Sequence, residues 1–200
     1  MKIIGLAGGS GSGKGTVSKI FLTLGIPSID ADAVYHNITS HKSPCLDALV
    51  LEFSPDILNL DGGLDRGKLS QIVFNSDNAE IKHKKLNEIS HKFVLSEIRA
   101  MISKYEKRGF DTVIVDAPLL FESGFNKECD VIISVFAPIE TRIERIISRD
   151  RIDRARALSR INSQIPDDTL RENSDYSICN DGDLEMLEKE IKKIYKLIKE

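Results

Sequence analysis

The chain has 200 residues, of which 41% are hydrophobic, and this length and composition suit one domain with a buried core. A formal net charge of -3 counts against a nucleic-acid-binding surface, which carries a strong positive charge. The apolar start of the chain is too short for a signal peptide, and no apolar stretch reaches the length of a membrane span. We therefore expect a cytoplasmic monomer that binds neither nucleic acid nor membranes.

The three cysteines, Cys45, Cys129 and Cys179, are widely spaced and form no pair of the CxxC type. The histidines do not join them at the spacing of metal ligands. This pattern favours a reduced protein with buried thiols over a disulfide framework or a zinc site.

Five short apolar runs predict buried strands, because a strand with helices on both faces is apolar on both sides. These strands are residues 3–7, 26–29, 112–115, 131–136 and 176–179. Helical patterns occupy residues 17–24, 139–149 and 184–198. The last of these helices has one apolar face, which we expect to pack on the chain's own sheet rather than in a coiled coil. The alternation predicts an α/β fold, with helices on both faces of a five-stranded parallel sheet.

One long region, residues 33–108, interrupts this alternation, because no part of it has a convincing strand pattern. Apolar residues at helical spacing predict helices there instead. These helices are residues 45–53, 67–74 and 81–105. We therefore expect a single domain with a core of about 1–32 and 109–200, and a helical, substrate-binding insertion of about 33–108.

Residues 8–16 read Gly-Gly-Ser-Gly-Ser-Gly-Lys-Gly-Thr, which is typical of a phosphate-binding loop, or P-loop. Its glycines let backbone N–H groups converge on phosphate oxygens, and the N-terminus of the following helix attracts anions. The alternative is a glycine-rich turn with a chance lysine, but the predicted strand before the loop and helix after it favour the P-loop. We expect Lys14 to reach the β- and γ-phosphates. The residues expected to bind ATP are Gly11, Ser12, Gly13, Lys14, Gly15 and Thr16.

The end of this loop departs from the standard motif, in which Ser or Thr directly follows the lysine and its hydroxyl binds Mg²⁺. Here Gly15 follows Lys14, and Thr16 comes one position later. Gly-Lys-Gly-Thr resembles the adenylate-kinase version of the loop. We expect Thr16 to hold Mg²⁺, either directly or through a water molecule.

Two aspartates, Asp30 and Asp32, follow the second predicted strand. Ligands of open α/β sheets bind at the carboxyl ends of the strands, so either aspartate is suited to accept the proton of an attacking hydroxyl. Each is equally suited to cap the helix that begins near Ala33. We expect Asp30 to be the structural residue and Asp32 to be the catalytic base.

A further aspartate, Asp116, ends the apolar strand of residues 112–115. An acid at this place beside a P-loop is the usual Walker-B arrangement, which orders Mg²⁺. We therefore predict Asp116 as a second metal-binding residue. Residues 118–122, Pro-Leu-Leu-Phe-Glu, follow it and are expected either to form a wall of the acceptor site or to pack in the core.

Seven arginines crowd between positions 142 and 160. Most such runs are solvated helix faces paired with acids, and several acids lie among these arginines. Phosphoryl transfer also profits from an arginine that meets the transition-state charge when a lid closes. We expect Arg149 to serve this purpose, with Arg171 as a second candidate, and we expect a lid at about 150–172. The motifs together predict an ATP-dependent kinase of a small molecule.

Several further segments extend this pattern along the chain. They are Leu24-Gly25 before Ile29-Asp30-Ala31-Asp32, Asp61-Gly62-Gly63-Leu64-Asp65-Arg66, Ile89-Ser90-His91, Pro118-Leu119-Leu120-Phe121-Glu122, Arg145 with Arg149-Asp150, Ala157 through Arg160-Ile161 to Gln164, and Asp175 with Ile178 and Asn180. Over nearly its full length the chain resembles the dephospho-CoA kinases. The resemblance implies that the chain transfers the γ-phosphate of ATP, with Mg²⁺, to the ribose 3′-hydroxyl of dephospho-CoA, the last step of coenzyme A biosynthesis. It also implies that Asp32 accepts the proton and that residues 33–108 bind the acceptor.

The chain departs from the family pattern at several positions besides Gly15. Lys92 follows His91 where the family usually has proline, and Phe93-Val94-Leu95 replaces a stretch that often holds an arginine. Tyr35-His36-Asn37 replaces the usual alanine–arginine pair after the aspartates. The two lost arginines bear on how the acceptor phosphate is bound, and not on the reaction class. We expect His91 itself to pack or hydrogen-bond rather than to catalyse.

Two other functions deserve weighing. The Gly-Lys-Gly-Thr loop by itself suggests a nucleoside-monophosphate kinase, which trials with dephospho-CoA and AMP would distinguish. A P-loop regulator that binds nucleotide without turnover is the other alternative. A GTPase would need an Asn-Lys-x-Asp guanine-binding motif after a strand, but residues 126–129 end in cysteine and precede their strand.

Overall fold

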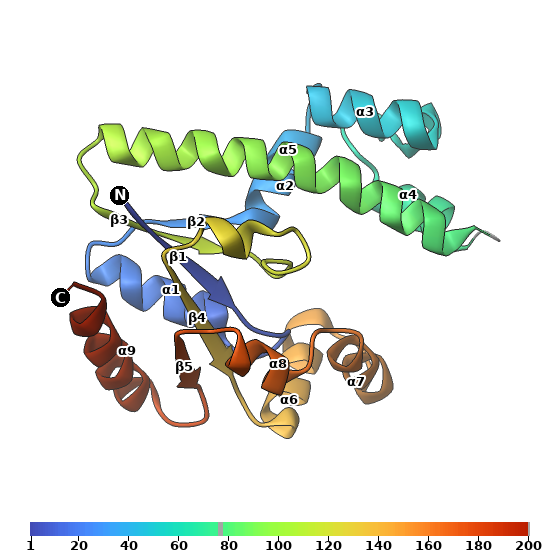
Figure 1. Cartoon of the computed structure of the whole chain (residues 1–200). Coiled ribbons are helices and arrows are strands. Elements are labelled where there is room, and N and C mark those ends of the chain that lie inside the picture. The colour runs from blue at the N-terminus through green and yellow to red at the C-terminus, as the bar shows by residue number, and fades with distance from the viewer. Residues whose placement is uncertain (76–77, 200) are drawn as a thin grey trace. The chain divides into compact units, whose positions relative to one another are not determined.

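The computed structural model describes residues 1–75 and 78–199 (Figure 1). Its centre is a five-stranded parallel sheet with the strand order β2-β3-β1-β4-β5. The strands are β1 (Lys2–Ala7), β2 (Ser28–Asp30), β3 (Thr112–Asp116), β4 (Val131–Phe136) and β5 (Tyr176–Cys179). The predicted α/β fold with a five-stranded parallel sheet is thus confirmed.

The chain divides into two compact units, each with its own hydrophobic core. We call Met1–Ile29 with Tyr105–Glu200 the sheet unit, and Asp30–Lys104 the helical unit. Among the described residues, no helix is both long and apolar enough to cross a membrane.

Strand β1 lies at the middle of the sheet, where it pairs with β3 and β4. Ile4 stands opposite Ile114 of β3 and Val131 of β4 in parallel register. Ile4 and Leu6 point to one face of the sheet and are fully buried in its core, and on the other face a Cβ on Gly5 would meet Cys129 and Leu120. The continuous apolar sequence of β1 is therefore explained by its central position.

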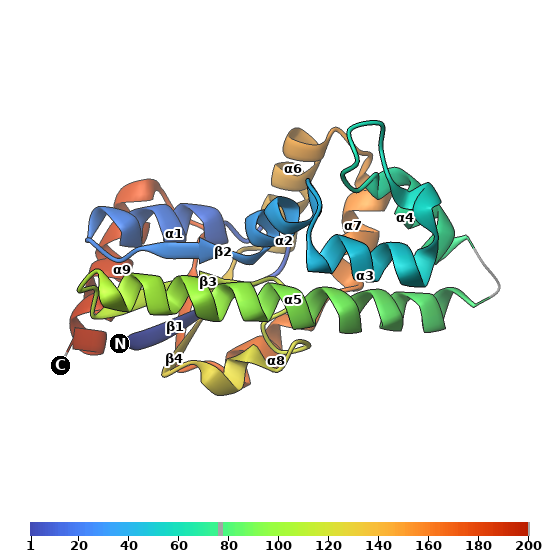
Figure 2. The same cartoon turned by 90° about the horizontal axis from the view of Figure 1, so that it is seen from above.

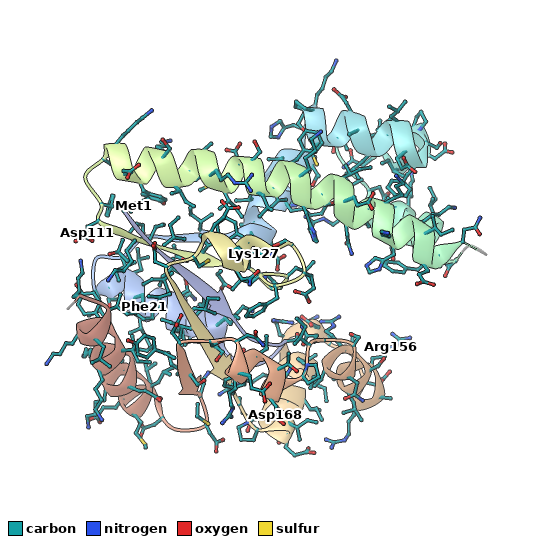
Figure 3. All side chains as sticks on the ribbon, viewed as in Figure 1. Met1, Phe21, Asp111, Lys127, Arg156 and Asp168 are labelled. Carbon is teal, nitrogen blue, oxygen red and sulfur yellow. The ribbon has the colours of Figure 1, made fainter. Side chains whose placement is uncertain are left out.

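Two helices of the sheet unit supply most of the core that packs against these strands. They are α1 (Lys14–Thr23) and α9 (Leu184–Lys199). Phe21 of α1 is fully buried, and its position between the two helices is visible in Figure 3. The apolar stripe of α9, which includes Ile191 and Ile198, joins the same core. The prediction that the C-terminal helix packs on its own sheet is confirmed.

Three further helices of the sheet unit follow β4. They are α6 (Ile139–Asp150), α7 (Arg154–Asn162) and α8 (Asp167–Glu172). Ile143 and Ile146 of α6 pack against Ala157 and Ile161 of α7 in a small separate core. Neither α7 nor α8 was predicted from the sequence, and the six residues of α8 are too few for an amphipathic pattern to stand out.

The helical unit has four α-helices among its described residues, one of which continues into the sheet unit (Figure 2). They are α2 (Ala31–Thr39), α3 (Pro44–Phe53), α4 (Arg66–Phe74) and α5 (Ala79–Lys107). Side-chain caps begin three of them: Asp30 accepts from Asp32 N and Ala33 N at the start of α2, Ser43 from Leu46 N at the start of α3, and Asp65 from Lys68 N at the start of α4. Leu49, Phe53 and other residues of α3 and α4 form a core that the apolar side of α5 completes.

The cysteine thiols do not share one environment. Cys45 is buried in the helical unit, and burial raises the pKa of its thiol to about 11. Cys129 lies against Gly5 of β1, and burial raises its pKa to about 12. Cys179 is exposed at the end of β5, so the expectation of buried thiols was wrong at this position.

Candidate active site

The P-loop connects β1 to α1 in a conformation that demands glycine. Gly11 and Gly13 have φ values of 78° and 95°, in the left-handed region that other residues rarely adopt. A Cβ on Gly13 would lie 1.9 Å from Nδ2 of Asn180, and a Cβ on Gly11 would lie 2.6 Å from the carbonyl oxygen of Arg142. Backbone conformation and close packing both require these glycines.

Two side chains hold the loop through its carbonyl groups. Arg145 of α6 donates to the carbonyl oxygens of Gly11 at 3.2 Å and Asn180 at 3.2 Å. Asn180 is buried and donates through Nδ2 to the carbonyl oxygen of Ser12 at 2.8 Å. These bonds draw the loop's carbonyl oxygens to one side, which lets its N–H groups face the other side, as a phosphate site requires.

Lys14 and Asp116, predicted separately, lie together beside the P-loop. Nζ of Lys14 is 3.7 Å from Oδ1 of Asp116, and it donates to the carbonyl oxygen of Gly8 at 3.0 Å. The two side chains are only 12% and 15% exposed. Asp116 ends β3 opposite Leu6 of β1, so the parallel register brings it to the start of the loop.

Ser12 provides an observation that points to a ligand at this loop. Its side chain is 1% exposed, and its Oγ has no hydrogen-bond partner among the described residues. A buried hydroxyl without a partner is costly, and a phosphate oxygen would satisfy it. The glycine backbone, Lys14 and Ser12 together therefore fit the phosphates of a nucleotide.

The predicted metal-binding residues fit a magnesium ion that is shared with phosphates. Thr16 is exposed in the first turn of α1, and Asp116 stands at the neighbouring strand end. No group of three or more His, Cys, Asp or Glu suited to a metal occurs within residues 1–75 and 78–199. Mg²⁺ bound to nucleotide phosphates needs only one or two protein ligands, so this pair meets the requirement.

Gly15 differs from the other glycines of the loop. A Cβ at this position would meet no atom within 4 Å. Neither packing nor a positive φ therefore requires glycine here. A serine hydroxyl, the usual group at this place in the motif, would be accommodated.

The two aspartates at the end of β2 and the start of α2 have different surroundings within the helical unit. Oδ1 of Asp30 accepts from the N–H groups of Asp32 at 2.9 Å and Ala33 at 3.1 Å, so Asp30 is the N-cap of α2. Asp32 lies in the exposed first turn of α2. The helix starts at Ala31, two residues before the predicted start near Ala33, because Asp30 supplies the cap.

Arg149 reaches the P-loop from the end of α6. Its Nη2 lies 3.4 Å from Oγ of Ser10, and its guanidinium donates to both carboxylate oxygens of Asp150 at 2.7 and 2.9 Å. Arg160 also donates to Asp150, and Arg149 first, then Arg160, hold the pKa of this carboxyl at about 2. Arg149 is 60% exposed, so it is both close to the loop and open to solvent.

The other arginines of this run have several different environments. Arg154 pairs with Glu140 and Arg156 pairs with Asp153 on the surface, as solvated helix faces do. Arg142 is 4% exposed, so the expectation of a solvated residue was wrong for it. Arg171 stacks on the ring of Phe136, with Cζ 4.5 Å from the ring centroid.

A hollow of about 190 Å³ lies beside the start of the P-loop. Its lining includes Gly8, Leu119, Glu122 and Gln164. Leu120, between these residues in sequence, is buried. Leu120 thus packs in the core while its neighbours line a hollow, and a wall of the acceptor site stays a prediction for this segment.

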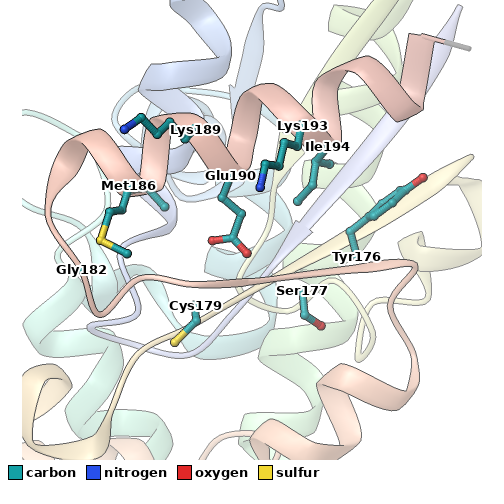
Figure 4. Close-up of a pocket in the computed structure, with 10 residues that line it drawn as sticks. Tyr176, Ser177, Cys179, Gly182, Met186, Lys189, Glu190, Lys193 and Ile194 are labelled. Carbon is teal, nitrogen blue, oxygen red and sulfur yellow. The ribbon is translucent and has the colours of Figure 1, made fainter.

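A different hollow, of about 520 Å³, lies between β5 and α9 (Figure 4). Tyr176 and Cys179 line it from the strand, and Glu190 and Lys193 line it from the helix. Burial raises the pKa of Glu190, and Lys193 partly opposes this. None of the predicted site residues is among those that line it.

In the helical unit, two side chains of α2 contact Arg66 at the start of α4. Its Nη2 donates to Nδ1 of His36 at 2.9 Å, and its guanidinium lies over the ring of Tyr35 at 5.7 Å. Burial raises the pKa of Tyr35. On α5, Nε2 of His91 is buried with no partner among the described residues, and burial lowers the pKa of this histidine.

Sequence reasoning missed the residues that support the P-loop from outside it. Arg142, Arg145 and Asn180 contact loop residues that are more than 130 positions away in sequence. No periodic pattern encodes such contacts. Two signals existed, the crowding of arginines after β4 and the family segments that contain Arg145 and Asn180, but neither indicated a contact with the loop.

Comparisons with known proteins agree with this geometry. A family model described as dephospho-CoA kinase matches residues 2–186. The dephospho-CoA kinase of Carboxydothermus hydrogenoformans is 39% identical over 191 residues, which cover 96% of this chain and 91% of that protein. That of Lactobacillus johnsonii is 37% identical over 188 residues, with 94% and 93% covered. A solved structure of dephospho-CoA kinase from Campylobacter jejuni aligns with a TM-score of 0.72 at 27% identity, covering 99% of this chain and 98% of that one. The resemblance seen in the sequence is thereby confirmed, and the chain belongs to the dephospho-CoA kinase family.

Proposed function

We propose that this chain transfers the γ-phosphoryl group of ATP to the ribose 3′-hydroxyl of dephospho-CoA, giving coenzyme A and ADP. Membership of the family supports the acceptor, and it favours dephospho-CoA over the nucleoside monophosphates that the Gly-Lys-Gly-Thr loop alone suggests. The single observation that carries the nucleotide half is the position of Lys14, which lies largely shielded from solvent at the P-loop beside Asp116. A P-loop lysine in this position neutralises and orients the β- and γ-phosphates.

In the proposed reaction, the 3′-oxygen forms a bond to the γ-phosphorus while the bond from that phosphorus to the β–γ bridging oxygen breaks. ADP leaves with the bridging oxygen, and the proton of the hydroxyl passes to the carboxylate of Asp32. Lys14 and the N–H groups of residues 11–16 hold the phosphates. Arg149 approaches the same loop and is suited to stabilise the charge that spreads over the transferred group.

Thr16 and Asp116 are the residues that would hold Mg²⁺. The ion, when bound, supplies charge neutralisation at the β- and γ-phosphate oxygens. The contact of 3.7 Å between Lys14 and Asp116 places this carboxylate beside the loop. Asp116 thus serves both the lysine and the ion.

The acceptor is proposed to bind to the helical insertion, residues 33–108, and residues 150–172 are proposed to act as the lid. The separate core of the helical unit supports the first assignment, because it lets this part present a surface of its own. Asp150, which accepts hydrogen bonds from both Arg149 and Arg160, supports the second. We further propose that the enzyme acts as a cytoplasmic monomer without nucleic acid.

The position of the new phosphate tests the proposal. The chain is incubated with ATP labelled at the γ-phosphate, dephospho-CoA and Mg²⁺, and the product is separated and weighed by mass spectrometry. We expect one labelled phosphoryl group on the product, and we expect a 3′-nucleotidase to remove it. A label that resists the 3′-nucleotidase, or no transfer to dephospho-CoA at all, would contradict the proposed reaction.

A further inference from the structure

Ser10, near the middle of the P-loop, is held through both of its backbone polar groups. Its N–H donates to Oε1 of Gln164 at 2.7 Å, and its carbonyl oxygen accepts from Nε of Arg142 at 2.9 Å. Gln164 lies between α7 and α8, and Arg142 lies on α6. Two segments far along the chain therefore fix the orientation of one P-loop peptide.

A single guanidinium joins these segments. Nη1 of Arg142 donates to both carboxylate oxygens of Asp167, at 3.0 and 3.2 Å, and Nη2 donates to Oε1 of Gln164 at 3.4 Å. Arg142 is 4% exposed, whereas the side chain of Asp167 is 38% exposed. The rigid fork of an arginine suits such a set of acceptors, and lysine could not reproduce it.

Gly9 shows that the loop is shaped around this guanidinium. A Cβ on Gly9 would lie 2.1 Å from Nη2 of Arg142 and 3.0 Å from Oε1 of Gln164. The missing side chain of Gly9 is therefore what lets the guanidinium and the amide approach the loop. This steric observation is independent of the hydrogen bonds and indicates the same arrangement.

A buried cation has few acceptable arrangements, because each N–H that loses its acceptor leaves charge unpaired in the interior. Arg142 meets this demand by contacting Ser10, Gln164 and Asp167 together. The backbone of Ser10 is thereby coupled to the start of α8. The hydroxyl of Ser10 is also the group that Nη2 of Arg149 approaches at 3.4 Å.

We propose that Arg142, Gln164 and Asp167 form a positioning clamp that preorganises Ser10 and so strengthens nucleotide binding at the P-loop. The inference rests on the part of the proposed function that assigns ATP to this loop. The three residues act through the loop backbone, and none of them is assigned a chemical step. Preorganisation strengthens binding because the loop is ordered before the phosphates arrive.

The test compares two neighbouring aspartates in the first turn of α8. Asp167→Ala removes the partner of Arg142, whereas Asp168→Ala removes an exposed carboxylate of the same helix end (Figure 3). Binding of a non-hydrolysable ATP analogue is measured without any acceptor, so the result does not depend on dephospho-CoA. We expect Asp167→Ala to weaken binding about fivefold to tenfold, and Asp168→Ala to change it less than about twofold.

A double-mutant cycle shows whether Asp167 acts through Arg142. We expect Arg142→Gln to weaken nucleotide binding, and Asp167→Ala to add no further loss in that background. If Arg142→Gln fails to fold, Gln164→Leu takes its place in the cycle, with the same expected lack of additivity. Kinetically, each clamp variant should raise KM for ATP while kcat at saturation changes less than about twofold.

Thermal midpoints measured alongside separate a positioning role from a general loss of stability. The proposal is overturned if Asp167→Ala lowers the midpoint while nucleotide binding stays at the wild-type value. It is equally overturned if Asp167→Ala and Asp168→Ala weaken binding to the same extent, or if the losses in the cycle add. Failure of the acceptor assay alone would leave this result standing, because that assay tests the proposed acceptor.

Discussion

The P-loop region and the helical unit are stabilised by different kinds of contact. At the P-loop, buried Arg142 and Asn180 and half-buried Arg145 satisfy the carbonyl oxygens of Ser10, Gly11 and Ser12, and the hydroxyl of Ser12 is left for a ligand. In the helical unit, α2, α3, α4 and α5 share an apolar core, and the paired guanidinium of Arg66 is exposed. The phosphate site is thus held by many long-range bonds, whereas the proposed acceptor part is held mainly by apolar packing.

This difference indicates which of the two regions tolerates amino-acid substitution. Contacts from several directions restrict the loop to one conformation. The loss of a single contact is therefore expected to weaken phosphate binding. A helical unit with its own core can alter surface residues while keeping its fold. His36 is an example of such a surface residue, because it is exposed where it contacts Arg66, whereas Tyr35 packs against the core.

The largest expected effect is a loss of turnover caused by a substitution in the P-loop. Lys14→Ala should abolish measurable turnover, a loss of about 10³-fold or more, because it removes the charge at the β- and γ-phosphates. Lys19→Ala is the matched control, since Lys19 is an exposed lysine of the same helix α1. Steady-state assays of ADP release measure both. Retained activity in Lys14→Ala, or an equal loss in Lys19→Ala, would remove the P-loop role assigned to this lysine.

The second largest effect is expected at the start of the helical unit, where substitutions of two neighbouring aspartates are compared. Asp32→Asn should lower kcat by about 10²-fold or more while ATP still binds, because an amide cannot accept the proton of the hydroxyl. Asp30→Asn should have little effect, since asparagine caps a helix about as well as aspartate does. Steady-state kinetics and nucleotide binding separate the two outcomes. If Asp30→Asn gave the larger fall in kcat, the assigned roles would have to be exchanged.

A smaller effect is expected at the one glycine of the loop that packing does not require. Gly15→Ser places a hydroxyl directly after Lys14, in space that is open in the structure. We expect a lower KM for Mg²⁺–ATP, by about twofold to tenfold, and a gain in folding stability of about 0.5 kcal/mol from the higher helix propensity of serine. A titration of Mg²⁺ at fixed ATP measures the first effect and thermal unfolding the second. A higher KM would show that Gly15 is needed for a reason other than space.

The smallest effect concerns stability and tests the packing of the helical unit. Burial holds the pKa of His91 below its ordinary value of 6.5, so unfolding takes up a proton when the pH is below this value. The stability from the buried neutral ring is therefore fully present above pH 6.5 and is lost as the pH falls further. Thermal midpoints between pH 7.5 and 5.0 should fall less steeply for His91→Gln than for the wild type.

The control for this pH series is His83→Gln, which changes an exposed histidine on the same helix α5. It should keep the wild-type dependence on pH. If His83→Gln flattened the curve as much as His91→Gln did, the buried ring would not be the source of the effect.

What the sequence could predict, and what it could not, follows the same division between local and distant contacts. The five strands, the P-loop and the C-terminal helix are local patterns, since apolar runs and glycine spacing act over a few residues. In the clamp, Ser10 contacts Arg142 and Gln164, which are 132 and 154 residues away in the sequence. No local pattern can therefore predict it. The start of α2 was misplaced because two neighbouring aspartates both suit a cap, and only the hydrogen bonds of Asp30 distinguish them.

The identity of the acceptor is central to the proposed function, and a comparison of two acceptors tests it most directly. ADP release is measured with saturating Mg²⁺–ATP and either dephospho-CoA or AMP, and kcat/KM is compared. We predict a preference for dephospho-CoA of at least about 10³-fold, because the proposed acceptor part would recognise more than the adenosine phosphate that the two share. Equal kcat/KM values for the two acceptors, or a clear preference for AMP, would contradict the proposed function. Such a result would instead favour a nucleoside-monophosphate kinase.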